Sequence, residues 1–282
     1  MGHHYVPKFY LRGFESEGTI WTFDKKSGNA FPSQAKSIAN ETDLYSDELE
    51  SYLANTIEEP AKPVLLKIRA REPLTESDRV ALARYIVALW KRVPKARQRA
   101  IDRMPEVATE VQENLNSELE SLAELDPNKR AQVEELKQRV AEIIARHISA
   151  PPPSAWHHSI QSESGPRILE ATLSMNWSFL ISEKNQFLSG DNPVFFFEHE
   201  GIGKPTSEIT LPFSSTVALW ASRGAAPNGR YLSAQPSAVK EINRRTAYNS
   251  VRFVYASRNE AWIKPFLDRG DWRLTRLRFG NA

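Results

Sequence analysis

The sequence predicts an α+β fold, because helical patterns occupy the middle of the chain and strand patterns occupy its flanks. Between residues 75 and 148 apolar residues recur at three- and four-residue steps, whereas short β-branched and aromatic runs fill the two ends. We expect an antiparallel sheet of about six or more strands built from both ends of the chain, helices packed on one face, and a projecting helical hairpin. The main domain then comprises 1–104 and the β-rich 150–282, and the hairpin is an insertion at 105–149.

The opening residues 1–14, MGHHYVPKFYLRGF, are too rich in aromatic and apolar residues for a loose tail. We expect an N-terminus tied into the fold, with a strand over 5–11 whose Pro7 lies at a sheet edge, where a missing N–H does no harm. The strand-like residues 19–23 and the segment 29–32 flank the turn sequence DKKSG, which predicts a β-hairpin.

The next part of the chain reads as helix. Apolar spacing predicts a helix over 43–57, which the prolines that follow should interrupt. Thr75 with Asp78 three positions later approximates a capping box, and the nearly continuous apolar run 80–90 indicates a buried helix. Pro94 should end or kink it.

Residues 106–148 show helical spacing that is broken once, at Asp126-Pro127-Asn128. We therefore expect two antiparallel helices joined by a short turn. The first, over 106–126, carries seven acids and no base. Its apolar stripe must rest on the body of the protein or on another subunit, which makes the hairpin a candidate for homo-oligomer contacts. The sequence APPPS at 150–154 predicts an extended linker.

Beyond this linker we expect one helix from Pro166 to Met175 and another over 237–248. Short runs with β-branched and aromatic residues predict the strands 177–182, 186–188, 194–197, 209–213, 217–221, 251–256, 262–266 and 272–279.

Composition narrows the chemistry. The 282 residues include no cysteine, which excludes disulfides, thiolate catalysis and cysteine-ligated metals. No apolar run approaches the roughly 18 to 20 residues that cross a bilayer and no signal peptide is visible, so we expect a cytoplasmic protein without a membrane partner. The net charge is only +2, but residues 219–282 hold twelve Lys/Arg against four acids. Nucleic acid or a phosphorylated ligand is therefore a candidate partner.

Two runs carry a resemblance to a known family. HHYVPKFYLRGF at 3–14 and SGDNPV at 189–194 resemble the signatures of a largely bacterial family catalogued as a domain of unknown function. Weaker similarity extends over most of the chain. The resemblance implies no activity.

The candidate catalytic residues are His3, His4 and Asp191. Neighbouring strand residues point to opposite faces, so at most one histidine faces a given cavity, where it could act as a general base. Asp191, in the loop after a predicted strand, could orient water. A site for Mg²⁺ or Mn²⁺ would need one histidine together with either Asp191 or the Glu58-Glu59 pair. Alternatively, a histidine anchors the terminus and Asp191 accepts backbone N–H groups in an Asx-turn.

The candidate substrate-binding residues are Arg12, Arg84 and Arg92. Arg12 could bind phosphate or pair with Asp191, and the two arginines of the buried helix, eight residues apart, indicate a buried acid or a bound anion. Two functions remain open. The first is a hydrolase of a phosphorylated substrate or nucleic acid that uses this His/Asp/Arg pocket. The second is a non-enzymatic macromolecule-binding module in which the same residues form a structural polar network.

Overall fold

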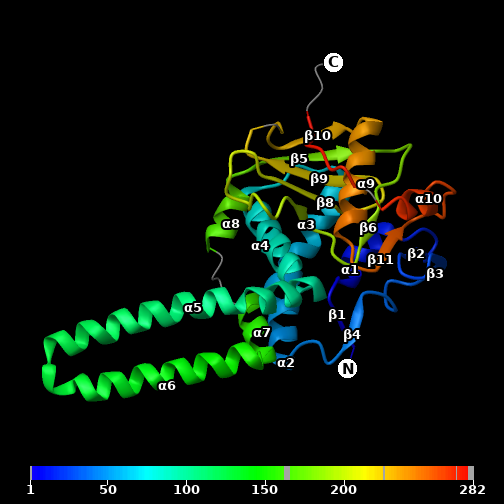
Figure 1. Cartoon of the computed structure of the whole chain (residues 1–282). Coiled ribbons are helices and arrows are strands. Elements are labelled where there is room, and N and C mark those ends of the chain that lie inside the picture. Colours follow the sequence, from blue (N-terminus) through cyan, green and yellow to red (C-terminus); the bar gives the residue numbers. More distant parts are fainter. Residues whose placement is uncertain (1, 162–165, 225, 271, 279–282) are drawn as a thin grey trace. The chain divides into compact units, whose positions relative to one another are not determined.

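A computed structural model describes residues 2–161, 166–224, 226–270 and 272–278 (Figure 1). The chain forms two compact units, a main unit of residues 1–93 and 161–282 and a helical unit of residues 94–160. Helices and mainly antiparallel strands occur together, which confirms the predicted α+β class. None of the helices in these ranges has the length and apolar character that crossing a membrane requires.

A four-stranded antiparallel sheet joins the two ends of the chain, as predicted. Its strand order is β3 (Asn29–Ser33), β2 (Ile20–Asp24), β11 (Phe253–Ala256) and β6 (Ser189–Gly190). Residues of β11 lie directly opposite residues of β2, with Phe253 facing Asp24 and Val254 facing Phe23. The hairpin of β2 and β3 confirms the strand-turn-strand pattern around DKKSG.

The remaining strands form a five-stranded and a two-stranded sheet. The larger has the order β10 (Arg230–Ser233), β5 (Asn176–Ile181), β9 (Val217–Ser222), β8 (Glu208–Pro212) and β7 (Phe195–Phe196). The smaller pairs β1 (Gly2–His4) with β4 (Asn40–Thr42). The expectation of one sheet therefore requires correction, because the described strands divide among three. The pairing of β10 with β5 is also parallel.

Helix α9 (Pro236–Asn249) packs across both larger sheets. Its Val239 and Ile242 join a core cluster with Leu180 of β5 and Trp220 of β9. One turn later, Ala247 joins a second cluster with β11 and α10 (Ile263–Asp268). The helix thus unites the two sheets, because its successive turns bury side chains against each in turn.

The other helices of the main unit precede the central strands. They are α1 (Lys8–Leu11), the 3₁₀ turn η1 (Arg12–Phe14), α2 (Asp47–Tyr52), the π-helical η2 (Leu53–Glu58), α3 (Glu59–Ala70), α4 (Glu76–Arg92) and α8 (Pro166–Leu173). Thr75 caps α4 in the predicted capping box, and α4 ends just before Pro94.

Three local predictions were wrong. Residues 5–11 are not a strand, because extended Pro7 caps the short helix α1 and the strand stops at His4. The prolines do not end the helical stretch, because Pro60 lies in the first turn of α3, where a missing N–H is tolerated, and α3 continues through Pro63 to Ala70. The predicted strands near the C-terminus are α10 and, over 272–278, a segment without regular structure; residue 279 lies outside the described ranges.

The helical unit contains the predicted helical pair. It consists of α5 (Pro94–Leu125), the turn η3 (Pro127–Lys129), α6 (Arg130–Ser149) and α7 (Pro153–Gln161), the last of which replaces part of the expected linker. Helices α5 and α6 run antiparallel side by side (Figure 1). The break falls at Asp126, whose carboxylate accepts the N–H of Asn128 at 3.2 Å.

Candidate functional site

The N-terminal histidine His3 ties strand β1 to helix α4 through Tyr45. Nδ1 of buried His3 accepts the backbone N–H of Tyr45 at 3.1 Å, and the two rings stack with 5.8 Å between centroids. The Tyr45 hydroxyl in turn donates to the backbone carbonyl of Arg92 at 2.5 Å. This His3 nitrogen is therefore used in holding the chain terminus.

Arg92 is 1% exposed and completes this network. Its guanidinium donates to Oε1 of Glu58 at 2.5 Å and to the backbone carbonyl of His4 at 2.6 Å. Burial acts to lower the pKa of Arg92, but Tyr45 and Glu58 outweigh it and hold that pKa above its usual value. We call His3, His4, Tyr45, Glu58 and Arg92 the N-terminal polar cluster.

Two buried nitrogens of this cluster have no hydrogen-bond partner among the described residues, Nε2 of His4 and Nε of Arg92. His4 is half-buried, and its Nε2 is shielded from water with no hydrogen-bond partner among the described residues. Burial, together with the positive charges of Lys8 and Arg92, lowers the pKa of His4. The imidazole is thus neutral near pH 7, with a nitrogen that solvent does not reach.

Asp191 acts as a buried acceptor for a distant loop. Its Oδ1 accepts the N–H of Val251 at 2.8 Å, and its Oδ2 accepts those of Arg252 and Phe253 at 2.7 and 2.8 Å. Burial raises the pKa of Asp191, and these three N–H groups oppose that rise. The carboxylate therefore fixes residues 251–253 at the start of β11. This is the structural role that the sequence offered as an alternative, except that the N–H groups lie some sixty residues away instead of within a local Asx-turn.

The remaining candidates lie apart from the polar cluster or at its margin. Tyr5, next to His4 in the sequence, lies near enough to Asp191 for an electrostatic effect. Burial raises the pKa of the Tyr5 phenol, and the Asp191 charge adds to that rise. Arg12 is exposed and lines a hollow of about 150 Å³ with Lys8, Glu15 and Lys36. Arg84 is half-buried on α4, the helix that carries Arg92. The structure thus brings His3, His4 and Arg92 together and places Arg12 in a separate hollow.

The same residues were the candidate ligands of a metal ion. Within the described ranges, no group of three or more His, Asp or Glu side chains is arranged to hold a metal ion. The carboxylate oxygens that were candidate ligands are engaged elsewhere, those of Asp191 by backbone N–H groups and Oε1 of Glu58 by Arg92.

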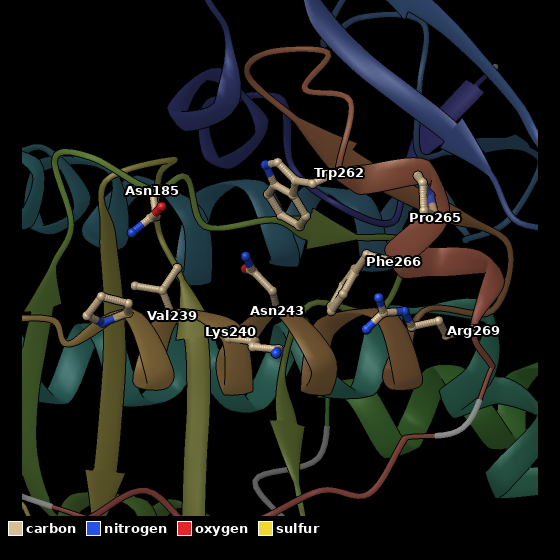
Figure 2. Close-up of a pocket in the computed structure, with 9 residues that line it drawn as sticks. Asn185, Val239, Lys240, Asn243, Trp262, Pro265, Phe266 and Arg269 are labelled. Atoms are coloured by element: carbon tan, nitrogen blue, oxygen red, sulfur yellow. The ribbon is translucent and has the colours of Figure 1, made fainter.

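A pocket of about 420 Å³ opens between α9 and α10, away from every residue selected from the sequence (Figure 2). Both helices present side chains at the same spacing, i, i+3, i+4 and i+7, which is one helix face. From α9 these are Pro236, Val239, Lys240 and Asn243; from α10 and its two caps they are Trp262, Pro265, Phe266 and Arg269; Asn185 completes the lining. We call this space the α9–α10 pocket.

Aromatic rings form one wall of the α9–α10 pocket. Trp262 and Phe266 meet edge to face with 5.5 Å between centroids, and Phe266 packs in the same way on Trp272 at 5.1 Å. Trp262 remains 37% exposed, and its indole N–H donates to Glu260. A rigid ring that is held at one end and open on a face can stack on a flat ligand.

Two cations and no carboxylate line the pocket. Lys240 and Arg269 are exposed, and neither forms an ion pair within the described ranges. In Figure 2 the charged end of Lys240 lies below Asn243, and that of Arg269 lies below Phe266. The amide of buried Asn243 is engaged, since its Nδ2 donates to Gln186 O at 3.0 Å and its Oδ1 accepts Leu188 N–H at 2.9 Å. The pocket therefore combines a fixed wall with unneutralised positive charge.

Two larger hollows, of about 680 and 630 Å³, open near the N-terminal end of α9 but are lined with carboxylates as well as cations. Glu241 in the first accepts the N–H of Thr275 at 2.8 Å, and Glu183 in the second pairs with Arg71 at 2.7 Å. Their charge is therefore mixed, whereas the lining of the α9–α10 pocket is positive only.

Sequence reasoning missed this pocket because residues 262–266 were assigned to a strand. Alternation along a strand would place Trp262 and Phe266 on one face but would separate Pro265 from them. The available signal was the parallel spacing of P-x-x-V-K-x-x-N at 236–243 and W-x-x-P-F-x-x-R at 262–269, which both fit a helix face.

Comparison with known proteins assigns the family. The family described as "Protein of unknown function (DUF4238)" matches residues 2–260, and the chain belongs to it. This agrees with the resemblance drawn from the two signature runs. No curated protein and no solved structure matches the chain.

Proposed function

We propose that the protein is a binding module for a phosphate-bearing ligand with a flat ring, a nucleotide either free or within a nucleic acid strand, and that the α9–α10 pocket holds it. The carrying observation is that Lys240 and Arg269 share one pocket with Trp262 and Phe266 and with no acid. Cations attract phosphate, and an open indole face stacks on a base of any sequence. A volume of about 420 Å³ lies within the range usual for small-ligand sites.

The contacts of the candidate His, Arg and Asp residues favour a binding function over hydrolysis. A hydrolase using His3, His4 and Asp191 needs a carboxylate free to orient water, and both Asp191 oxygens accept backbone N–H groups. Arg92 is likewise engaged by Glu58 and by the His4 carbonyl rather than open to an anion. We therefore treat His3, His4 and Arg92 as part of the N-terminal polar cluster that secures the N-terminus, and Asp191 as the acceptor that holds residues 251–253. A cytoplasmic location remains our proposal on composition alone.

Titration calorimetry on the full chain tests the proposed site. The probes are a nucleoside monophosphate, the matching nucleoside, inorganic phosphate and a short single-stranded oligonucleotide, each at low and at physiological salt. We expect the phosphorylated nucleoside or the oligonucleotide to bind more tightly than either the nucleoside or phosphate alone. Higher salt should weaken that binding, because cations supply part of it.

Variants locate the binding. Arg269→Ala and Lys240→Ala should each weaken it about tenfold or more, since a charge-assisted hydrogen bond contributes roughly 1.5–3 kcal/mol. Lys264→Ala is the matched control, because Lys264 is an exposed cation on the same short helix that does not line the pocket. Absence of binding by every probe, or equal losses in all three variants, would refute the proposed site.

A further inference from the structure

The helices of the helical unit meet along a narrow and partly polar line. The less exposed residues include Ala108, Gln112, Asn116, Leu119 and Ala123 on α5 and Val133, Lys137, Val140, Ile144 and Ile148 on α6. Only Ala123 and Val133 of these are buried. We call these ten residues the contact line of the pair.

A second set of large apolar side chains lies beside this line and stays exposed. Its members are Val107, Val111, Leu115, Leu122, Leu136 and Ile143, which are between 37% and 55% exposed. We call these six residues the apolar face. So many half-exposed apolar side chains on one helical pair are unusual for a surface that meets only water.

The apolar face is one continuous surface that spans both helices. Each member directly precedes a residue of the contact line in the sequence, as Val111 precedes Gln112 and Leu136 precedes Lys137. One residue back is a turn of about 100° around the helix axis. Because α5 and α6 are antiparallel, the same backward turn from each contact line leads to the same side of the pair. Valines and leucines of α5 therefore lie beside Leu136 and Ile143 of α6.

Charges bordering the apolar face differ between the two helices. Exposed Glu110 and Glu118 lie on its outer edge along α5, and exposed Arg139 and Arg146 lie on its outer edge along α6. None of the four forms an ion pair within the described part of the chain. Exposed Glu135 and Glu142 lie four residues before these arginines, further around α6 from the apolar face. The charges nearest the face are thus acidic at Glu118 on α5 and basic at Arg139 and Arg146 on α6.

These edge charges also lie at matching heights. Lys137 pairs across the line with Glu120, which sets the relative height of the two helices. Glu118 lies two residues before Glu120, and Arg139 lies two residues after Lys137, so the two are at the same height on antiparallel helices. Glu110 and Arg146 lie about two turns further along in the same directions. Each acid therefore has a base at its own height on the neighbouring helix edge.

We propose that the apolar face docks on the same face of a second copy of the chain and forms an antiparallel four-helix bundle. A two-fold axis parallel to the helices places α5 of one copy opposite α6 of the other at unchanged height. Glu118 then faces Arg139 of the second copy, and Glu110 faces its Arg146. The other face-to-face arrangement, with the axis across the helices, sets acidic α5 against acidic α5, which like-charge repulsion disfavours. The contacts of Glu118 with Arg139 and of Glu110 with Arg146 thus favour a second copy of the chain in this orientation.

Sedimentation velocity on the full chain over a concentration series provides the first test. We expect the wild type to approach twice the mass of one chain as concentration rises. Val111→Glu should shift that transition at least tenfold higher in concentration, because it places a charge in the apolar face. Ser117→Glu is the matched control, an added carboxylate on the opposite side of the same helix. Circular dichroism checks that both variants keep their helix content.

Mixing two charge variants provides the second test and does not depend on the first. Glu118→Arg and Arg139→Glu alone should each weaken association about tenfold, since every dimer then contains two like-charge contacts. A mixture of the two should associate like the wild type. The arginine introduced in one variant would meet the glutamate introduced in the other, and the native pair would form once. Rescue by mixing cannot arise within one chain.

Three outcomes would overturn the proposal. A wild type that stays monomeric at every concentration would mean that the apolar face is covered by its own chain or left in water. A dimer unaffected by Val111→Glu would assemble through another surface. Rescue of Glu118→Arg by wild type rather than by Arg139→Glu would indicate the α5-on-α5 arrangement.

Discussion

Single residues in this protein show how a catalytic residue type can serve structure. Asp191 sits in the loop sequence SGDNPV, where a carboxylate could face solvent, yet it is 6% exposed and accepts three backbone N–H groups from residues 251–253. These N–H groups lie at the start of β11, and a partly buried N–H that loses its partner costs up to roughly 1–3 kcal/mol. The residue thus connects a central loop to the last strand of the four-stranded sheet.

Asp191→Asn tests that role. The amide keeps one acceptor oxygen and places an NH₂ group against a backbone N–H, so we expect a loss of about 1–3 kcal/mol in the free energy of unfolding at pH 7. Urea unfolding measures it. Asp268→Asn, at an exposed position of α10, is the control and should change stability by less than about 0.5 kcal/mol. Equal stability of wild type and Asp191→Asn would contradict the structural role.

His4 makes stability depend on pH. Its pKa is lowered below the 6.5 of an unshifted histidine, so below pH 6.5 the unfolded chain takes up a proton that the folded protein resists. The stabilisation is complete above pH 6.5 and is lost as pH falls through the folded pKa. We expect His4→Gln to remove this dependence, so that the wild-type advantage shrinks between pH 6.5 and 5. His158→Gln, on an exposed side of α7, should show the same pH dependence as wild type. A stability difference between wild type and His4→Gln that is constant with pH would contradict the argument.

Helices and turns could be predicted where several local signals agreed. Predictions failed where the same residue types suit two kinds of secondary structure. The Thr75–Asp78 box, the apolar run after it and the Asp126-Pro127-Asn128 break each combine spacing with a cap or turn, and all three were confirmed. The aromatic residues at 262–266 suit a strand or a short helix equally well. Only burial against Leu188 and Val254 settles them as helix, and that packing is not visible in the local sequence.

The cap of α4 supports an element-scale prediction. The Thr75 hydroxyl oxygen accepts the N–H of Asp78 at 3.2 Å, and Asp78 returns a bond to the N–H of Thr75 at 2.9 Å. Thr75→Ala should therefore cost about 1 kcal/mol of unfolding free energy, within the usual range for N-caps. Ser237→Ala, in the first turn of α9 and without a hydrogen bond to its hydroxyl among the described residues, should cost less than half as much. A larger loss at Ser237 than at Thr75 would argue against the capping box as the source.

At the scale of the whole molecule, the sequence predicted the fold class and the helical pair but neither the division of the sheet nor the α9–α10 pocket. The pairing of β2 with β11 spans more than two hundred residues, and which strands pair at such separation depends on packing that no local pattern records. The α9–α10 pocket could not be predicted for a related reason. Its two walls are helix faces that form a pocket only because α9 and α10 are neighbours. These helices are neighbours because both pack into one core cluster with Leu188 and Val254.

The division into two units leads to a last prediction, that the main unit folds without the helical pair. The two core clusters described above draw only on residues of the main unit, such as Trp220 with Ile242 and Val254 with Ile263. Replacing residues 105–149 with eight Gly/Ser residues should be tolerated, because antiparallel helices leave the cut ends about 8–10 Å apart and such a linker spans roughly 15 Å. We expect cooperative urea unfolding with a free energy within about 1 kcal/mol of the wild type, ligand binding in the α9–α10 pocket unchanged, and a monomeric mass at all concentrations. Loss of cooperative unfolding would show that the main unit depends on the helical pair, and a persisting dimer would place self-association outside it.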